Sequence, residues 1–136
     1  MRRFHQRIIE AARSAIKNKA KPDKFSHATL ILVQKKIICV GVNNQCKTHT
    51  KAFKDRPTWA FQHSELASII RFKKKCGIDF NKTCGYNVRI GKSGNVLMSR
   101  PCPVCQQLII GANFKNFYYT NNLGLFEEFV FKPTGV

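Results

Sequence analysis

Two short segments of the chain hold side chains of the kind that bind metals and move protons. His63 and Glu65 flank a single serine, and Cys102 and Cys105 follow Pro101. One imidazole and two thiolates give three ligands of the type that zinc prefers, and they leave the fourth tetrahedral position for water. The spacing therefore predicts an open, catalytic zinc site with His63, Cys102 and Cys105 as its ligands.

Each of these segments lies at the start of a predicted helix, at 62–75 and at 103–111. Unpaired backbone N–H groups and the helix dipole favour thiolate at such a position, and Cys102 and Cys105 lie on one helical face. Zinc lowers the pKa of a bound water toward neutrality. Glu65 is then placed to take the proton of that water and pass it on, as a general acid and base.

Each segment alone allows other interpretations. A bare Cys-x-x-Cys pair suits a redox pair or a structural zinc half-site, and His-x-Glu at a helix start suits an ordinary cap. The main alternative is a closed structural site with Cys84 or Cys76 as the fourth ligand, which would leave Glu65 without a role.

The rest of the chain predicts the elements that must position these residues. An amphipathic helix at 2–19 precedes two apolar runs rich in β-branched residues, which predict a buried hairpin, and a long loop follows at 43–60. We expect Gly111 to end the helix that Pro103 begins. Further extended segments are predicted at 86–90, 96–98, 114–120 and 126–132, the last as a strand or a short helix. This order predicts an α/β fold, a three-layer α-β-α sandwich with a mixed sheet of about five strands.

Length and composition limit the class of protein. With 136 residues, the chain is expected to form a single domain over 1–136. It has 24 Lys and Arg against 7 Asp and Glu, a formal net charge of +17, which favours a phosphorylated or polyanionic partner. No signal-peptide pattern or long apolar run is evident, so we expect an intracellular, cytoplasmic protein without membrane contact. Its six cysteines are then expected to be thiols or metal ligands.

The motifs resemble those of the cytidine deaminase superfamily, which includes cytidine, deoxycytidylate, tRNA adenosine and APOBEC-type polynucleotide deaminases. The resemblance is carried by three segments: His63-Ser-Glu65-Leu-Ala, Arg100-Pro-Cys-Pro-Val-Cys105-Gln-Gln-Leu-Ile, and Gly41-Val-Asn43. It implies Zn²⁺ as the cofactor and hydrolytic deamination, with zinc-bound hydroxide attacking C4 of cytosine and Glu65 as the proton shuttle. The commoner form of the first motif has alanine where this chain has Ser64.

The resemblance also implies substrate contacts. Asn43 matches a family asparagine that contacts the sugar, and Ser64 and Pro101 lie inside the two motifs. His49 lies in a Lys-Thr-His-Thr segment similar to one in deoxycytidylate-type members. Trp59 suits base stacking or core packing equally.

The substrate is a cytosine nucleoside or nucleotide if the chain follows the free-substrate enzymes. Free cytidine deaminases join the last two strands by a hairpin, whereas the other subfamilies insert a helix there. The short C-terminus and Asn121-Asn-Leu-Gly124 favour a hairpin. Because of the charge, two alternatives stay open. One is deamination of cytosine or adenine in single-stranded DNA, RNA or tRNA, and the other is a non-catalytic, zinc-stabilised nucleic-acid-binding module. We expect a homo-oligomer.

Overall fold

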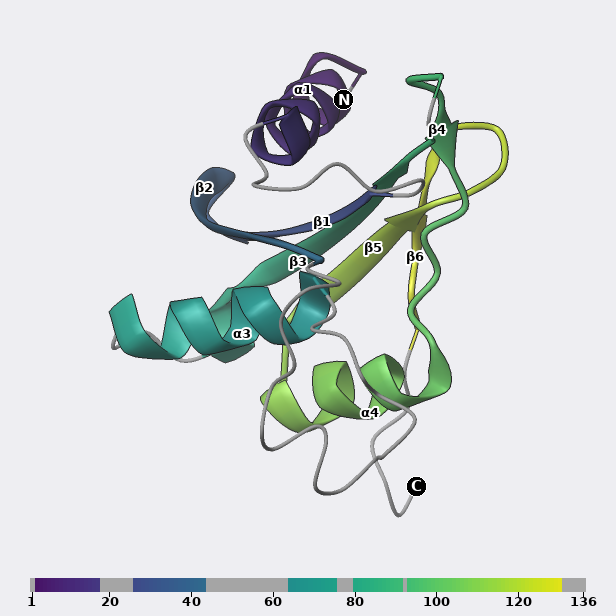
Figure 1. Cartoon of the computed structure of the whole chain (residues 1–136). Coiled ribbons are helices and arrows are strands. Elements are labelled where there is room, and N and C mark those ends of the chain that lie inside the picture. Colours follow the sequence, from purple (N-terminus) through teal and green to yellow (C-terminus); the bar gives the residue numbers. More distant parts are fainter. Residues whose placement is uncertain (1, 18–25, 44–63, 76–79, 92, 131–136) are drawn as a thin grey trace.

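The computed structural model describes residues 2–17, 26–43, 64–75, 80–91 and 93–130. One mixed sheet lies between two helical layers, with α1 on one face and α3 and α4 on the other (Figure 1). The elements are α1 (Arg2–Lys17), β1 (Ser26–Val33), β2 (Lys36–Val42), α3 (Ser64–Lys75), the 3-10 turn η1 (Phe80–Lys82), β3 (Cys84–Ile90), β4 (Val96–Leu97), α4 (Pro103–Ala112), β5 (Asn116–Thr120) and β6 (Phe126–Glu128). The predicted α-β-α sandwich is confirmed.

The sheet has six strands, ordered β2-β1-β3-β5-β6, with β4 paired to β3. Among the described strands only the β3–β5 pair is parallel, and α4 lies in the connection between these two strands. Strands β1 and β3 therefore lie inside the sheet, where both of their faces are covered. Side chains on these two strands can reach both helical layers.

The first two strands form the predicted hairpin. Gln34 and Lys35 turn the chain, and both have positive φ angles, 51° and 66°. Val33 pairs with Lys36 directly across this two-residue turn. Lys36 therefore belongs to β2.

Each face of the sheet has its own apolar core. On the α1 face the buried residues are Ile8, Ala12, Ala28, Leu30, Leu32, Tyr86, Val88 and Ile90. On the face of α3 and α4 they are Ile31, Cys39, Ile69, Phe72, Ile109, Phe114, Phe117, Tyr119 and Phe129. The alternation of Leu30 and Ile31 between these two cores shows how one strand serves both layers.

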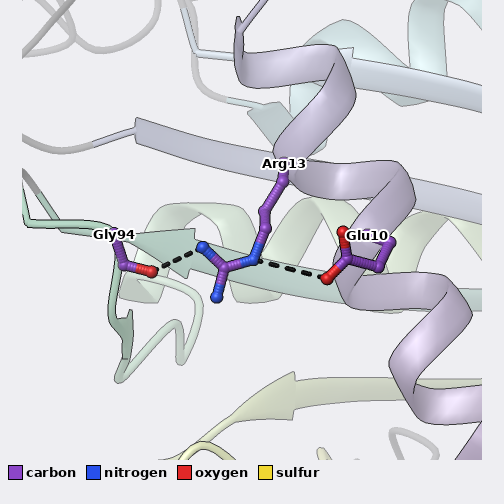
Figure 2. Close-up of polar contacts among 3 residues, drawn as sticks. All are labelled: Glu10, Arg13 and Gly94. Carbon is purple, nitrogen blue, oxygen red and sulfur yellow. Dashed lines mark hydrogen bonds and ion pairs between the residues drawn. The ribbon is translucent and has the colours of Figure 1, made fainter.

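Helix α1 is also tied to the turn between β3 and β4 by a polar contact. Arg13 Nη1 donates to the backbone oxygen of Gly94 at 2.6 Å, and Arg13 Nε lies 3.8 Å from Glu10 Oε1 (Figure 2). Gly94 has a φ of 93°, a value that glycine adopts without strain. The guanidinium therefore fixes one end of α1 over the sheet.

The last helix ends later than the sequence suggested. Gly111 lies within α4, and Asn113 forms the C-cap with φ of 72°. The prediction that Gly111 ends this helix is wrong, because asparagine also tolerates the left-handed conformation and takes the capping position.

The final two strands form a tight antiparallel hairpin. Thr120 pairs with Phe126, and the backbone N–H of Asn121 donates to the oxygen of Leu125 at 2.8 Å. The predicted hairpin is confirmed. In the described part of the chain, no helix is both long enough and apolar enough to cross a membrane.

Candidate active site

Glu65 lies in the first turn of α3, where it is 5% exposed. Its Oε1 accepts a hydrogen bond from Ser64 Oγ at 3.1 Å, and its Oε2 accepts one from Asn87 Nδ2 at 3.0 Å. A carboxyl group this deeply buried needs such partners, because burial without them is costly. Both oxygens of the predicted proton shuttle are thus held in place by named donors.

The two cysteines lie at the start of α4. Cys102 is the N-cap, Pro103 follows in the first turn, and the backbone N–H of Cys105 donates to Cys102 Sγ at 3.4 Å. Gln106 Nε2 donates to the backbone oxygen of Pro101 at 2.8 Å, which fixes the entry into the helix. The sequence therefore predicts correctly that both sulfur atoms belong to one helical turn.

The pKa of Cys105 on α4 depends on groups from both α4 and α3. The Cys105 side chain is fully buried, and its pKa is raised by a hydrogen bond with Cys102, by burial and by the negative charge of Glu65. In the metal-free chain these three effects oppose the helix dipole, which favours the thiolate. A bound cation would reverse the balance.

The chemistry of these donors suits zinc. Two thiols on one turn, with a buried carboxyl near one of them, Cys105, suit a metal site with an adjacent proton shuttle. The third predicted ligand, His63, lies outside the described residues, directly before α3. Within the described ranges no three histidine, cysteine or acidic side chains gather around one point.

The closed-site alternative gains no support from Cys84. This cysteine is in β3, and its Sγ lies 3.9 Å from Asn116 Oδ1 on β5. Among the described residues it forms no three-ligand cluster with the α4 cysteines. Cys76 lies outside those residues.

The predicted substrate contacts are placed only in part. Asn43 follows β2, and its Oδ1 accepts from the backbone N–H of His27 at 2.9 Å. Ser64 is 1% exposed and contacts Glu65, and Pro101 is buried beside the cysteines. His49 and Trp59 lie outside the described residues, so their roles stay predictions.

Three polar residues near Glu65 were not predicted. Thr29, Asn87 and Ser99 are almost completely buried, and Asn87 donates directly to the carboxyl group. The signal available in the sequence was a threonine and an asparagine inside otherwise apolar strands. A buried polar side chain needs a partner, but periodicity does not show which one.

Solved structures of nucleoside and nucleotide deaminases share this fold. The cytidine deaminase from Burkholderia pseudomallei has a TM-score of 0.64 at 16% identity, over 92% of this chain and 91% of that one. The dCMP deaminase of cyanophage S-TIM5, in complex with dCMP and dUMP, gives 0.58 at 17% identity, over 88% and 82%. The cytidine deaminase from Mycobacterium leprae gives 0.57 at 18% identity, over 88% of both chains.

The family follows from the sequence. The family model described as the cytidine and deoxycytidylate deaminase zinc-binding region matches residues 2–121. The chain therefore belongs to this family of zinc-binding deaminases. No curated protein matches it.

Proposed function

We propose that the chain is a zinc-dependent hydrolase that removes the C4 amino group of cytosine in a free nucleoside or nucleotide. The observation that carries this proposal is the buried Glu65 carboxyl, held by Ser64 and Asn87 and close enough to Cys105 to raise the pKa of that thiol. A proton-transferring acid thus lies near Cys105, one of the proposed metal ligands. The family and the fold agree with this arrangement.

His63, Cys102 and Cys105 would hold the metal. When bound, zinc supplies a water molecule whose pKa lies near neutrality. Glu65 would take one proton from the attacking water and deliver it to N3 of cytosine as the water oxygen bonds to C4. It would then take the remaining hydroxyl proton and pass it to the amino group, so that the C4–N bond breaks and cytosine and water give uracil and ammonia. Its burial keeps bulk water from competing for that proton.

Asn43, Ser64, Pro101, His49 and Trp59 remain the proposed substrate contacts. Asn43 is held at the end of β2 by its two hydrogen bonds with the backbone of His27. An asparagine anchored in this way presents little conformational freedom, which suits contact with a sugar hydroxyl.

The preference for a free nucleoside or nucleotide rests on the β5–β6 hairpin. Thr120 to Phe126 turns back without a crossover helix, which is the connection that the resemblance associates with free cytidine deaminases. A second candidate, deamination of cytosine or adenine in a polynucleotide, is favoured by the net charge of +17.

Substitution of the carboxyl group tests the mechanism. We expect the purified protein to hold about one zinc per chain. Glu65→Gln should retain the metal and lose turnover by at least about 10²-fold. Glu128→Gln on β6, an exposed glutamate outside the site, is the matched control and should retain activity. Full activity of Glu65→Gln would refute the proposed mechanism.

The substrate class is tested by measuring ammonia release from cytidine, deoxycytidylate, single-stranded DNA and tRNA side by side. Turnover of the first two supports the proposal. Turnover confined to DNA or tRNA would favour the second candidate, and no release from any of them would favour a binding module without catalysis.

A further inference from the structure

Asn87 occupies a central position between the two halves of the site. It lies in β3, directly opposite Thr29 on β1, and it is 1% exposed. Its Oδ1 accepts from Thr29 Oγ1 at 2.5 Å, and its Nδ2 donates to Glu65 Oε2 at 3.0 Å and to the backbone oxygen of Ser99 at 3.2 Å. One amide therefore contacts three separate segments of the chain.

The orientation of this amide is determined by its partners. A carboxyl oxygen of Glu65 and a backbone carbonyl both accept, so the NH₂ group must face them, and the amide oxygen then faces the Thr29 hydroxyl. A flipped amide would place its oxygen against two acceptors. The Thr29 hydroxyl thus holds Asn87 in the orientation that serves Glu65.

The same residues reach the segment that leads into the cysteine helix. Ser99 Oγ donates to the backbone oxygen of Asn87 at 2.8 Å, and the backbone N–H of Thr120 donates to Ser99 Oγ at 2.7 Å. Ser99 lies just before Pro101 and Cys102 in the sequence. Asn87 therefore ties the acid on α3 to the entry of α4 through the middle of the sheet.

Thr29 also contacts the residue beside the acid. Its Oγ1 lies 2.8 Å from Ser64 Oγ, which in turn lies 3.1 Å from Glu65 Oε1. Thr29, Ser64, Glu65 and Asn87 thus form a closed ring of side chains in polar contact around the carboxyl group. Each hydroxyl has one hydrogen, so Thr29 donates to Asn87 and Ser64 donates to Glu65, and the two hydroxyl oxygens are neighbours. Rotation of Glu65 would break bonds on both sides of this ring.

We propose that Thr29 and Asn87 are positioning residues for the reaction, which hold the Glu65 carboxyl group in a fixed orientation relative to the cysteine pair. This inference rests on the proposed function. A misplaced proton shuttle slows the chemical step, whereas substrate binding elsewhere is unaffected. Loss of a hydrogen-bonding partner behind the reacting or metal-binding groups typically lowers activity by about 10- to 100-fold.

The first test compares two substitutions of one residue. Thr29→Val keeps the shape and removes the hydroxyl, whereas Thr29→Ser keeps the hydroxyl. We expect Thr29→Val to lower kcat by about 10-fold, with KM and zinc content nearly unchanged, and Thr29→Ser to restore kcat. Thr83→Val, an equally buried change outside the ring, is the matched control for lost packing and polarity.

Two kinetic outcomes would overturn the proposal. One is a Thr29→Val protein with unchanged kcat. The other is a loss of kcat in Thr29→Val no larger than that in Thr83→Val at a similar loss of Tm, which would assign Thr29 a structural role only.

The second test uses thermal unfolding of the purified protein and needs no activity. Asn87→Asp places a second carboxylate beside Glu65 and should lower Tm by roughly 5–10 °C. Adding Glu65→Gln supplies an amide donor to Asp at that position, so the double variant should recover much of this loss. Additive losses of Tm would show that the two side chains do not interact, and would overturn the proposal.

The two tests separate this inference from the proposed function. If no substrate is deaminated, the proposed function fails, yet the Tm cycle still reports on the Asn87–Glu65 contact. If Glu65→Gln abolishes turnover but Thr29→Val does not lower kcat, the function holds and the positioning role fails.

Discussion

Cys105 is the residue at which two opposing electrostatic effects meet. Its place in the first turn of α4 favours the thiolate. Its hydrogen bond with Cys102, its burial and the charge of Glu65 raise its pKa, so the thiol is protonated near neutral pH without a metal. A bound cation must therefore displace at least one proton.

We predict that zinc binding releases protons and strengthens as the pH rises. Because Cys105 stays protonated in the metal-free chain, the apparent zinc affinity should rise about tenfold per pH unit for each proton released, between pH 6 and 8. Competition with a chelator at several pH values measures this slope, and calorimetry in buffers of different ionisation enthalpy counts the protons.

Cys39→Ser provides the control for that measurement. Cys39 is buried in the α3 and α4 core, where its Sγ lies 3.7 Å from the backbone oxygen of Ser68. We expect Cys39→Ser to leave the slope of zinc affinity against pH unchanged. A zinc affinity independent of pH would contradict the account of Cys105.

At the scale of elements, the close approach of β2 to α3 places the acid. A Cβ added to Gly41 would lie 2.4 Å from the backbone nitrogen of Ser68 and 2.8 Å from the backbone oxygen of Ser64. Only the absence of a side chain allows the first turn of α3, with Glu65, to lie so near the strand.

We predict that Gly41→Ala destabilises the fold and the site together. The contacts are with backbone atoms of a packed helix, so α3 must shift, and we expect a loss of about 1–3 kcal/mol in the free energy of unfolding. Urea denaturation measures the loss, and a parallel assay should show reduced turnover because Ser64 and Glu65 move. Wild-type stability would show that the strand and helix lie further apart.

Gly111→Ala should have the opposite effect. Gly111 lies inside α4, its added Cβ would meet nothing within 4 Å, and Asn113 provides the cap. Replacing a helical glycine by alanine should stabilise the protein by roughly 0.5–1 kcal/mol, with unchanged kcat. The same denaturation experiment tests it, and a loss of stability would indicate that α4 ends at Gly111.

For the molecule as a whole, the net charge of +17 exceeds what one phosphate group requires. A polynucleotide displaces several counterions when it binds, so its affinity falls steeply with salt. A mononucleotide makes few phosphate contacts. The two proposed substrate classes should therefore differ in how strongly their binding depends on salt.

We predict a shallow salt dependence of KM for deoxycytidylate. With one or two phosphate contacts, the slope of log KM against log salt should be below about 2. For single-stranded DNA, the logarithm of the binding constant should fall with log salt with a slope of about 0.7 for each phosphate contacted. Cytidine, without phosphate, is the control and should show almost no slope. A deoxycytidylate slope as steep as that of DNA would mean that the basic surface binds anions nonspecifically.

The sequence by itself determined the class of fold and the chemistry of the predicted site. Hydrophobic periodicity placed the strands and helices, because burial of one face imposes a period of two or 3.6 residues. The spacing of Cys102 and Cys105 determined that they share one turn, since residues three apart on a helix face the same way. Local features of this kind need no partner from elsewhere in the chain.

Only the tertiary structure decided what surrounds Glu65. Thr29, Asn87 and Ser99 come from distant segments, and they meet because β1 and β3 pair in the middle of the sheet. Nothing in the order of residues along a strand tells which carboxyl group a buried asparagine faces. Likewise, burial and the negative charge of Glu65 from another helix add to the hydrogen bond with Cys102 in raising the pKa of Cys105, and the spacing of the two cysteines shows neither of these two effects. Electrostatics and hydrogen bonds act through space, whereas sequence patterns report only on neighbours along the chain.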